Sequence, residues 1–534
     1  MFSLISFSKY LGVGIFFASQ SNAVNPLEIK GYKFFDSVSG DEVIIKGIDY
    51  YPRPNEGPLN FNSLDYYTEE HRKLWKRDIA YFEELGVNAI RLYAVDPDKN
   101  HDSFMCALDA ANIYVIVALA KDCPTCAITR DQAPHCYPTA LKKRGQAVID
   151  AFAKYSNTLG FSAGNEVNHF APPGMPQWNG ICQKKFLRDI REYIASCPSL
   201  RKVPVGLIIA DTDRTQNVLY YNCQSDPTDR YENAEWLGLN AYVMCDGTGT
   251  RYEDALGLKA LQKSFDSYNY SIPVLMTEFG CLSDSFPVVD GYHGQRTFMQ
   301  ARWLIDQPGL RSLFAGAFGF EYSIEKANAR QESPYPFKCF GKQNYGIANM
   351  SILISPNSTI VGFFEPENCN DINIPCEYHP LPSFDFLKEA YNQSSAFPLT
   401  TIDSFSVPLG RTGRSQCPKS FKPLSSFKWE ADSTPFLRCP IEQDTKFACP
   451  AHSGSRFFGK FIRITFWGLI VFIVYTLKNE KPYDNDKKGS EKDDTSSETS
   501  SSYSTRLLVL TGIGKKYFHY QSIESDMSSD ELDI

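Results

Sequence analysis

Two glutamates that close apolar, strand-like segments are the residues in this sequence whose types and spacing could do chemistry. Glu166 closes a segment that begins at Thr158, and Glu278 closes the segment VLMTE. Burying an ionised carboxylate costs several kcal/mol unless it is paired or required for function. Two carboxylates about 5 to 5.5 Å apart are the apparatus of a retaining glycosidase, in which one is the nucleophile and the other the acid and then the base. Asn165, beside Glu166, could hydrogen-bond a sugar 2-hydroxyl.

Eight candidate strands could position these side chains. They span residues 43–51, 88–95, 114–120, 158–166, 203–210, 236–243, 273–279 and 313–322. Intervening stretches such as 72–86 and 182–196 carry apolar residues at helical spacing with a charged opposite face. Eight strand–helix units predict an α/β fold of the (β/α)8 or TIM barrel type. A doubly wound open sheet is the alternative, but no Gly-rich phosphate turn follows the first strand.

In such a barrel, reactive groups gather where the strands end. Glu166 ends the fourth predicted strand and Glu278 the seventh, on opposite sides of the ring, so the two carboxylates can face each other across one cleft. Either glutamate alone could be an ordinary strand-end carboxylate with satisfied hydrogen bonds. Both together, at these two positions, favour catalysis.

The N-terminal segment and the cysteines predict a secreted or surface protein. Residues 1–23 place Lys9 before an apolar stretch and end in Ser-Asn-Ala, which is typical of a signal peptide; a short buried helix is the alternative. Fifteen cysteines, none beyond Cys449, fit an oxidising compartment. Cys123 and Cys126 favour loop disulfides over a zinc site, because no second CxxC or finger-spaced His pair accompanies them. Glycosylation sequons occur at Asn269, Asn349, Asn357 and Asn392.

The C-terminal quarter changes composition several times. Residues 400–456 are rich in Pro, Ser and Phe with three cysteines, which predicts a stalk or a small disulfide-tied module after a catalytic domain at 24–399. Residues 457–477 predict one transmembrane helix, with an internal helix of a small C-terminal unit as the alternative. Residues 478–534 predict a disordered cytosolic tail, whose acidic end SSDELDI does not fit a glycolipid-anchor signal. The prediction is a plasma-membrane protein with its catalytic domain at the cell surface.

The charge pattern and the histidines narrow the possible partners. A formal net charge of -8 with scattered Lys and Arg gives no basic stripe, which argues against nucleic acid as a partner. His169 has no second His or Cys at ligand spacing, so we expect no metal site and no other cofactor.

Six motifs carry a resemblance to a known family: LGFSAGNEV, IRLYAVDP, NIYVIVALA, GLNAYVMC, TEFGC and FEYS. They resemble the fungal-type β-1,3-glucanosyltransferases of glycoside hydrolase family 72, over approximately residues 31–345. The resemblance implies a membrane-anchored barrel enzyme that cuts an internal β-1,3-glucan bond and passes the new reducing end to another glucan chain. The polysaccharide is then both donor and acceptor.

The resemblance also assigns residues. It implies that Glu166 is the acid/base and Glu278 the nucleophile. It places further cleft residues at Asn165, Tyr242, Asn240, Tyr50, Arg91, Tyr93 and Tyr322. A tyrosine offers a pyranose a flat face, and an arginine can lower the pKa of a carboxyl group. Core packing is the alternative for Tyr50, Tyr93 and Arg91.

Cysteine positions and departures from the family pattern give further expectations. The resemblance implies a Cys245–Cys281 disulfide and a bond from Cys223 to a downstream cysteine such as Cys369 or Cys376. Trp75 and Phe104 together replace a cysteine pair that the family bonds, and Ala118 stands where the family usually has Asp. Residues 325–346 are longer than the usual connection and predict a loop over the cleft. The cysteine-rich glucan-binding module of some members has no counterpart.

Two other functions stay open from the sequence. Ala118 favours a retaining endo-β-1,3-glucanase as the alternative enzyme. The Ser-rich tail allows a membrane-anchored glucan-binding receptor, although the intact pair of glutamates counts against a purely binding role.

Overall fold

The structure, a computed structural model, describes residues 24–52, 64–243, 251–279, 298–323, 362–364, 378–380, 382–393, 399–445 and 447–450. Its centre is a closed barrel of eight parallel strands in the order β10-β11-β4-β5-β6-β7-β8-β9. The strands are β4 (Ile45–Asp49), β5 (Ala89–Leu92), β6 (Tyr114–Ala118), β7 (Thr158–Asn165), β8 (Val205–Ala210), β9 (Leu237–Asn240), β10 (Val274–Phe279) and β11 (Gly316–Gly319). Each lies within one of the eight predicted segments. The (β/α)8 prediction is confirmed, and the open sheet is excluded.

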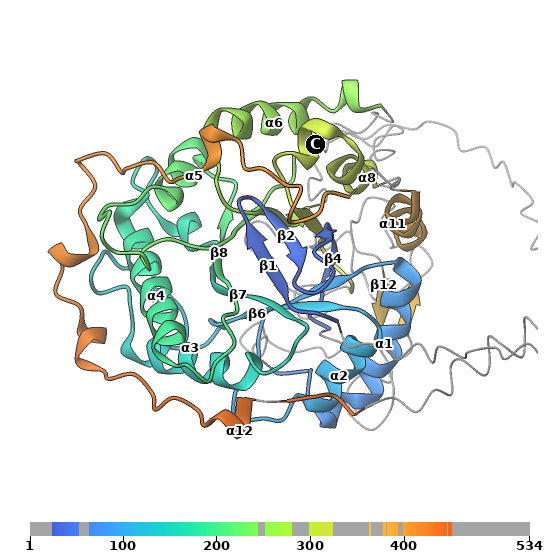
Figure 1. Cartoon of the computed structure of the whole chain (residues 1–534), viewed down its shortest axis with the longest axis horizontal. Helices are drawn as coiled ribbons and strands as arrows, with labels where there is room; N and C mark the ends of the chain where they lie inside the picture. Colours follow the sequence, from blue (N-terminus) through green and yellow to red (C-terminus); the bar gives the residue numbers. More distant parts are fainter. Residues whose placement is uncertain are drawn as a thin grey trace, which may run out of the picture. The chain divides into compact units, whose positions relative to one another are not determined.

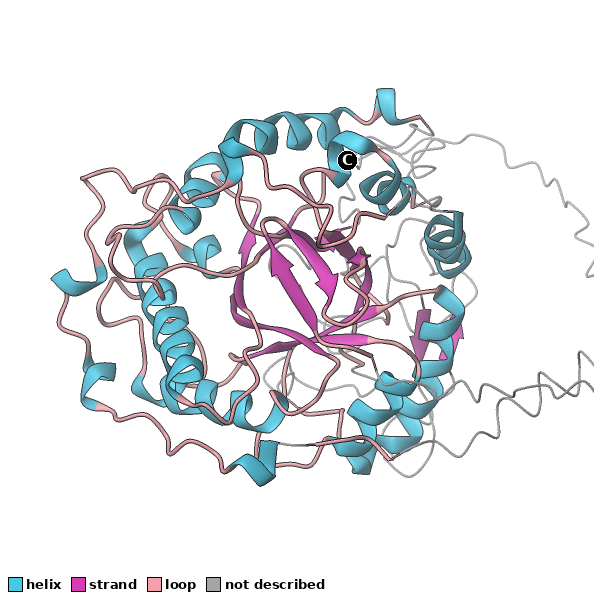
Figure 2. Cartoon of the chain, viewed as in Figure 1, coloured by secondary structure: helices cyan, strands magenta, loops and turns pink. Residues whose placement is uncertain are grey.

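Helices surround the strands, as Figure 2 shows. They are α1 (Arg72–Leu85), α2 (Asp102–Ala110), α3 (Thr139–Phe152), α4 (Gln177–Ser196), α5 (Arg214–Asn222), α6 (Leu256–Tyr268), α8 (Met299–Asp306), α9 (Pro308–Arg311) and α11 (Pro382–Gln393). The last of these, α11, contacts both α1 and α8 and so completes the ring. The two predicted helices at 72–86 and 182–196 correspond to α1 and α4.

The sequence of α1 shows why such a helix forms and stops. Leu74, Ile79 and Phe82 are buried on one face, at the spacing that a helix packed on a sheet requires. Gly86 then adopts a left-handed conformation with φ of 75°, and its N–H bonds the carbonyl of Phe82. Glycine reaches this conformation without a Cβ penalty, so the helix ends there.

A small antiparallel sheet closes one end of the barrel. It consists of β1 (Leu27–Lys30), β2 (Lys33–Asp36) and β3 (Glu42–Val43). Leu27 and Phe34 pack in one buried cluster with Ile45, Ala89 and Leu159, which lie where barrel strands begin. Figure 1 shows β1 and β2 in front of the barrel, and the barrel strands finish at the opposite end. A second small sheet pairs β12 (Gly362–Phe364) with β13 (Tyr378–Pro380).

Residues 399–450, which we call the C-terminal belt, are coloured orange in Figure 1. The belt begins against the small sheet, where Glu42 N–H bonds the carbonyl of Thr400, and then passes along the outside of α5 and α4. The belt contains the short helix α12 (Glu442–Thr445). Three disulfides attach it to the barrel helices, Cys417 to Cys223, Cys439 to Cys197 and Cys449 to Cys106. Leu424 and Trp429 are buried in the main hydrophobic core. The segment therefore belongs to the same compact unit as the barrel and is tied to it by disulfides, where the sequence predicted a stalk or a small disulfide-tied module.

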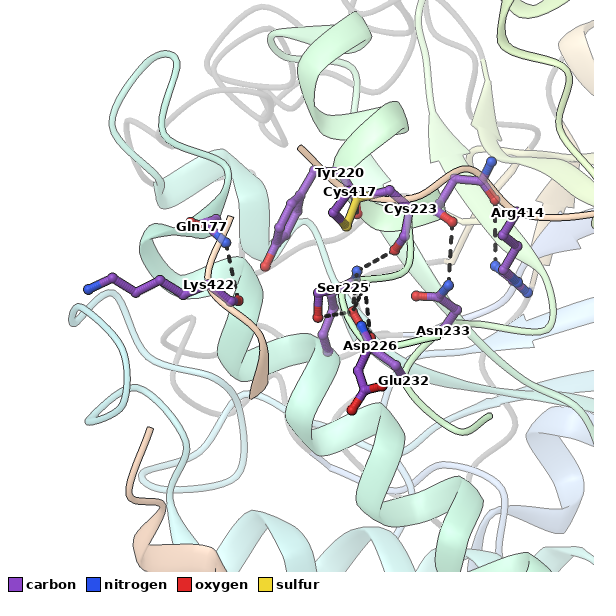
Figure 3. The surroundings of a disulfide bond; sticks show 12 residues. Gln177, Tyr220, Cys223, Ser225, Asp226, Glu232, Asn233, Arg414, Cys417 and Lys422 are labelled. Carbon is purple, nitrogen blue, oxygen red and sulfur yellow. Dashed lines mark hydrogen bonds and ion pairs between the residues drawn. A yellow bond between two sulfur atoms is a disulfide. The ribbon is translucent and has the colours of Figure 1, made fainter. Parts of the chain in front are cut away.

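Cys223 bonds a downstream cysteine, as expected, but the two examples named for it were wrong. Cys223 follows α5 and bonds Cys417, not Cys369 or Cys376 (Figure 3). The backbone next to Cys223 pairs with the belt and brings the two cysteines together. The N–H of Gln224 bonds the carbonyl of Ser415, and the N–H of Cys417 bonds the carbonyl of Gln224. Figure 3 also shows Arg414 of the belt hydrogen-bonded to the backbone of the barrel.

Two other cysteine-related expectations can be compared with the structure. Cys123 bonds Cys126, as a loop disulfide. Trp75 of α1 and Phe104 of α2 meet edge to face with ring centroids 5.6 Å apart. An aromatic contact therefore joins these helices at the positions where the resemblance implied a cysteine pair in relatives.

Several expectations concern residues outside the described ranges. These are the signal peptide at 1–23, Cys245 and Cys281, the loop at 325–346, the span at 457–477 and the tail at 478–534. Among the helices that the structure describes, none has the length and apolar character needed to cross a bilayer.

We expect removal of the Cys223–Cys417 bond by a double serine substitution to lower the free energy of unfolding by about 2–4 kcal/mol. The bond closes a loop between residues 194 positions apart, and long loops lose the most entropy on cross-linking. Thermal denaturation of the purified chain measures the change. The matched control replaces Cys123 and Cys126, which are 3 positions apart and should cost much less. Equal losses in the two double variants would contradict the prediction.

Candidate active site

Glu166 stands immediately after β7, where the backbone changes direction. Its φ is 53°, in the left-handed region, which is uncommon for residues other than glycine and often marks functional sites. Its N–H bonds the carbonyl of Ile208 in β8 at 3.0 Å, and its own carbonyl accepts the N–H of His169 at 2.9 Å. The short 3-10 helix η3 (Val167–Phe170) follows. These bonds fix the glutamate at the carboxyl end of the barrel.

Glu278 lies inside β10 and is only 4% exposed. One carboxylate oxygen, Oε1, accepts hydrogen bonds from Arg91 Nη1 at 2.9 Å and from the hydroxyl of Tyr93 at 3.0 Å. The other, Oε2, accepts the hydroxyl of Tyr242 at 2.7 Å. Three donors, one of them a cation, therefore converge on this carboxyl group.

Two asparagines connect the glutamates. The amide nitrogen of Asn240 donates to Glu166 Oε1 at 2.9 Å and to Asn165 Oδ1 at 3.1 Å. Asn165 Oδ1 also accepts from Arg91 Nη2 at 2.7 Å. Asn240 is held in turn by Thr277, whose hydroxyl donates to its carbonyl oxygen at 2.8 Å. The barrel thus assembles one network from seven predicted residues: Glu166, Glu278, Asn165, Asn240, Tyr242, Arg91 and Tyr93.

The surroundings of Glu166 weaken its acidity. Burial raises the pKa of Glu166 to about 7, and the nearby charge of Glu278 adds to the rise. The hydrogen bond from Asn240 and the charge of Arg91 oppose it. Burial also disfavours the charge of Arg91, but its acidic neighbours outweigh burial and raise its pKa. At neutral pH the site therefore holds a carboxyl group that can give a proton, beside one held in place by a cation.

Tyr50 and Tyr322 do not join this network. Both side chains are fully buried, and their hydroxyls donate to the two oxygens of Asp78 in α1, at 2.8 and 3.0 Å. Their rings pack on each other 5.4 Å apart, and that of Tyr322 stacks on Tyr378. For both residues the geometry shows packing between the barrel and α1, where the resemblance implied cleft positions.

The structure adds two residues that sequence reasoning missed. Asp49 ends β4, is fully buried, and lies 3.3 Å from Arg91 Nη1 through its Oδ1. Its signal was the same as for Glu278, an acid closing an apolar strand, and could have been found in the same way. Thr277 gave no such signal, since threonine is common in strands. In the described part of the chain, no cluster of three or more His, Cys, Asp or Glu side chains could hold a metal ion.

Comparison with known proteins adds the family. A family model described as glucanosyltransferase, glycoside hydrolase family 72, matches residues 16–330, more than half of the chain. The chain belongs to this glucanosyltransferase family. The resemblance drawn from the six motifs is confirmed.

Curated relatives share this part of the glucanosyltransferase sequence. The 1,3-beta-glucanosyltransferase PGA4 of Candida albicans is 33% identical over 314 residues, which cover 57% of this chain and 61% of that protein. The 1,3-beta-glucanosyltransferase gel1 of Aspergillus fumigatus is 33% identical over 308 residues, covering 57% and 60%. The chain spans about three fifths of the length of these curated relatives.

Solved structures of the family share the fold. A mutant of Gas2p from Saccharomyces cerevisiae, in complex with laminaritetraose and laminaripentaose, superposes with a TM-score of 0.53 at 27% identity, covering 73% of each chain. ScGas2 in complex with a small compound gives 0.52 at 26% identity, covering 73% of this chain and 75% of that one.

Proposed function

We propose that this member of the glucanosyltransferase family is a retaining β-1,3-glucanosyltransferase. It cuts an internal β-1,3-glucan bond and transfers the new reducing end to a second glucan chain. The observation that carries the proposal is the unequal environment of the two glutamates, with Glu166 near a pKa of 7 and Glu278 held by three donors. The names of the relatives and the laminari-oligosaccharides bound by Gas2p support the substrate class.

In the first step a carboxylate oxygen of Glu278 attacks the anomeric carbon. The glycosidic bond breaks, its oxygen takes the proton of Glu166, and a covalent glycosyl–enzyme forms. In the second step Glu166, now ionised, removes the proton from the 3-hydroxyl of an acceptor glucan. The acceptor oxygen attacks the anomeric carbon and releases Glu278 as a carboxylate. Two inversions at the same carbon give net retention.

Asn165 is placed to recognise the sugar. It is exposed, unlike the strand residues before it. Its hydrogen bonds to Arg91 and Asn240 both use the carbonyl oxygen, so its amide nitrogen remains available as a donor among the described residues. A hydrogen bond from this amide to the sugar 2-hydroxyl would strengthen in the transition state.

We expect activity to fall as the pH rises through about 7, because the first step needs Glu166 protonated. The alkaline limb of kcat/KM on a reduced β-1,3-oligosaccharide should have its midpoint there. In Asn240→Ala the limb should move to higher pH, since the hydrogen bond that lowers the pKa of Glu166 is lost. Asn217→Ala, which changes a buried asparagine of α5, is the control and should leave the limb in place. A limb that Asn240→Ala does not move would contradict this assignment.

Product sizing tests the function itself. The full chain is incubated with a reduced β-1,3-oligosaccharide and the products are separated by length. Products longer than the donor establish transfer. Shorter products alone would make the protein a hydrolase, and intact binding without turnover would make it a receptor.

The proposed place of action is the cell surface. In this proposal residues 1–23 direct secretion and residues 457–477 anchor the protein in the plasma membrane, with the barrel outside and residues 478–534 inside the cell. The disulfides of the described part support an oxidising compartment. Release of the full chain from membranes by alkaline carbonate would argue against the anchor.

A further inference from the structure

Asp49 is a buried acid that the proposed reaction does not use. It ends β4, and its side chain is inaccessible to solvent. Its Oδ1 lies 3.3 Å from Arg91 Nη1, and its Oδ2 has no hydrogen-bond partner in the described part of the chain. An unpartnered buried oxygen costs free energy, and it costs far more if it carries a charge.

The contact of Asp49 is made to a nitrogen that is already shared. Arg91 Nη1 bears two hydrogens, yet it lies 2.9 Å from Glu278 Oε1, 2.9 Å from the hydroxyl of Tyr93 and 3.1 Å from the carbonyl of Thr277. Asp49 is the most distant of these four acceptors. An ionised Asp49 would compete with Glu278 for one buried cation and leave a buried negative charge unpaired.

The titratable groups around Asp49 come from four elements. They are Arg91 of β5 and Tyr93 directly after it, Glu278 of β10, Glu321 after β11 and Tyr391 of α11. Burial raises the pKa of Asp49 well above its ordinary value; the charge of Arg91 and the hydroxyl of Tyr93 oppose this rise, and Glu278 and Glu321 add to it. The local balance of charge therefore agrees with the geometry in favouring the uncharged acid.

We propose that Asp49 is a positioning residue. As a neutral acid it holds the Arg91 guanidinium beside Glu278, and it does not compete with Glu278 for the positive charge of Arg91. The inference rests on the proposed function, in which Glu278 is the nucleophile. It assigns Asp49 a second use in the glycosyl–enzyme. There Glu278 is an ester and no longer an anion, so the contact with Asp49 continues to hold Arg91 in place for the second step.

The test compares Asp49→Asn with Asp49→Ala in the full chain. Asparagine keeps the shape and the acceptor oxygen, so kcat on the reduced β-1,3-oligosaccharide should stay within about twofold and the acidic limb of the pH profile should not move. In the alanine variant Arg91 loses its support. We expect kcat to fall about tenfold with KM within about twofold, and the acidic limb to move to higher pH. Asp189→Asn, a buried acid of α4, is the control and should leave the profile unchanged.

A second readout needs no activity. If Asp49 is neutral in the folded protein, wild type loses stability as the pH rises above the unfolded pKa of the acid, and Asp49→Asn does not. The Tm of Asp49→Asn should therefore exceed that of wild type at pH 7, with a gain that shrinks toward pH 4. An ionised Asp49 paired with Arg91 would give the opposite sign.

These measurements separate the two proposals. Wild type without turnover would refute the proposed function, while the Tm comparison would still decide the charge of Asp49. A lower Tm of Asp49→Asn at pH 7, a loss of kcat equal to that of Asp49→Ala, or an alanine variant with wild-type kcat and pH profile would each overturn the role given to Asp49.

Discussion

Glu278→Gln should lower kcat on β-1,3-oligosaccharides by about 10⁴-fold or more. The glutamine amide cannot form the glycosyl–enzyme, and the hydroxyls of Tyr93 and Tyr242 and the guanidinium of Arg91 lose the anion they surround. Turnover is measured by separating the products of the full chain by length. Glu278 is a buried residue, 4% exposed, so folding is checked by thermal denaturation.

The matched control is Glu235→Gln, a conservative exchange of a glutamate before β9, at the end of the barrel opposite the site. It should keep wild-type kcat. A Glu278→Gln variant that folds and retains a tenth or more of the wild-type rate would remove Glu278 from the nucleophile role. Proton NMR of the first product formed by wild type should show the β-anomer, as retention requires.

Glu166→Gln should lower kcat by about 10² to 10⁴-fold, the range typical of a lost general acid–base. The remaining activity should no longer fall as the pH rises through 7, because the group that titrates near that pH is gone. A β-1,3-oligosaccharide linked to an acidic, electron-poor phenol releases the phenolate without a proton from Glu166. The variant should therefore form the glycosyl–enzyme from that donor at nearly the wild-type rate, whereas Glu278→Gln should not.

The pH dependence of the Tm of Glu166→Gln tests the raised pKa of Glu166 independently of activity. Wild-type Glu166 has its folded pKa raised from 4.5 to about 7, so its contribution to stability is present below about 4.5 and lost as the pH rises toward 7. Glutamine has no such loss. The Tm of Glu166→Gln should equal that of wild type near pH 4 and exceed it above pH 7. A Tm difference that does not change with pH would mean that Glu166 has an ordinary acidity in the fold.

The network around the glutamates was predictable because of the symmetry of the fold. Eight parallel strands that close a barrel must end at one face, so Glu166 and Glu278 had to converge once their strands were recognised. The misplacement of Tyr50 and Tyr322 has a physical cause. Successive side chains of a strand point to opposite faces of the sheet. After the last residue of a strand this alternation is no longer regular, so the sequence does not tell which face the next side chain takes. Asp49 lies in the barrel and the neighbouring Tyr50 packs outward on α1.

The contacts between segments far apart in the chain were harder to predict from the sequence. The resemblance implied only that Trp75 and Phe104 together replace a bonded cysteine pair, and in the structure their rings meet edge to face. No local pattern linked Cys223 to Cys417, because cysteine spacing does not define connectivity. The belt as a whole has no strong periodicity, and its place is set by single anchors such as the Lys142 ammonium group, which bonds the carbonyl of Ala431 at 2.8 Å.

The belt also imposes an order on biosynthesis. Cys106, Cys197 and Cys223 are translated 343, 242 and 194 residues ahead of the partners that they finally bond. On the proposed secretory route, these three thiols would enter an oxidising lumen before their correct partners are made. Until the belt is made, the bonds available to the barrel are Cys123–Cys126 and Cys136–Cys182, whose partners follow within 3 and 46 residues. We therefore expect maturation of this protein to depend on a disulfide isomerase, because the early thiols can form incorrect bonds that must be exchanged later.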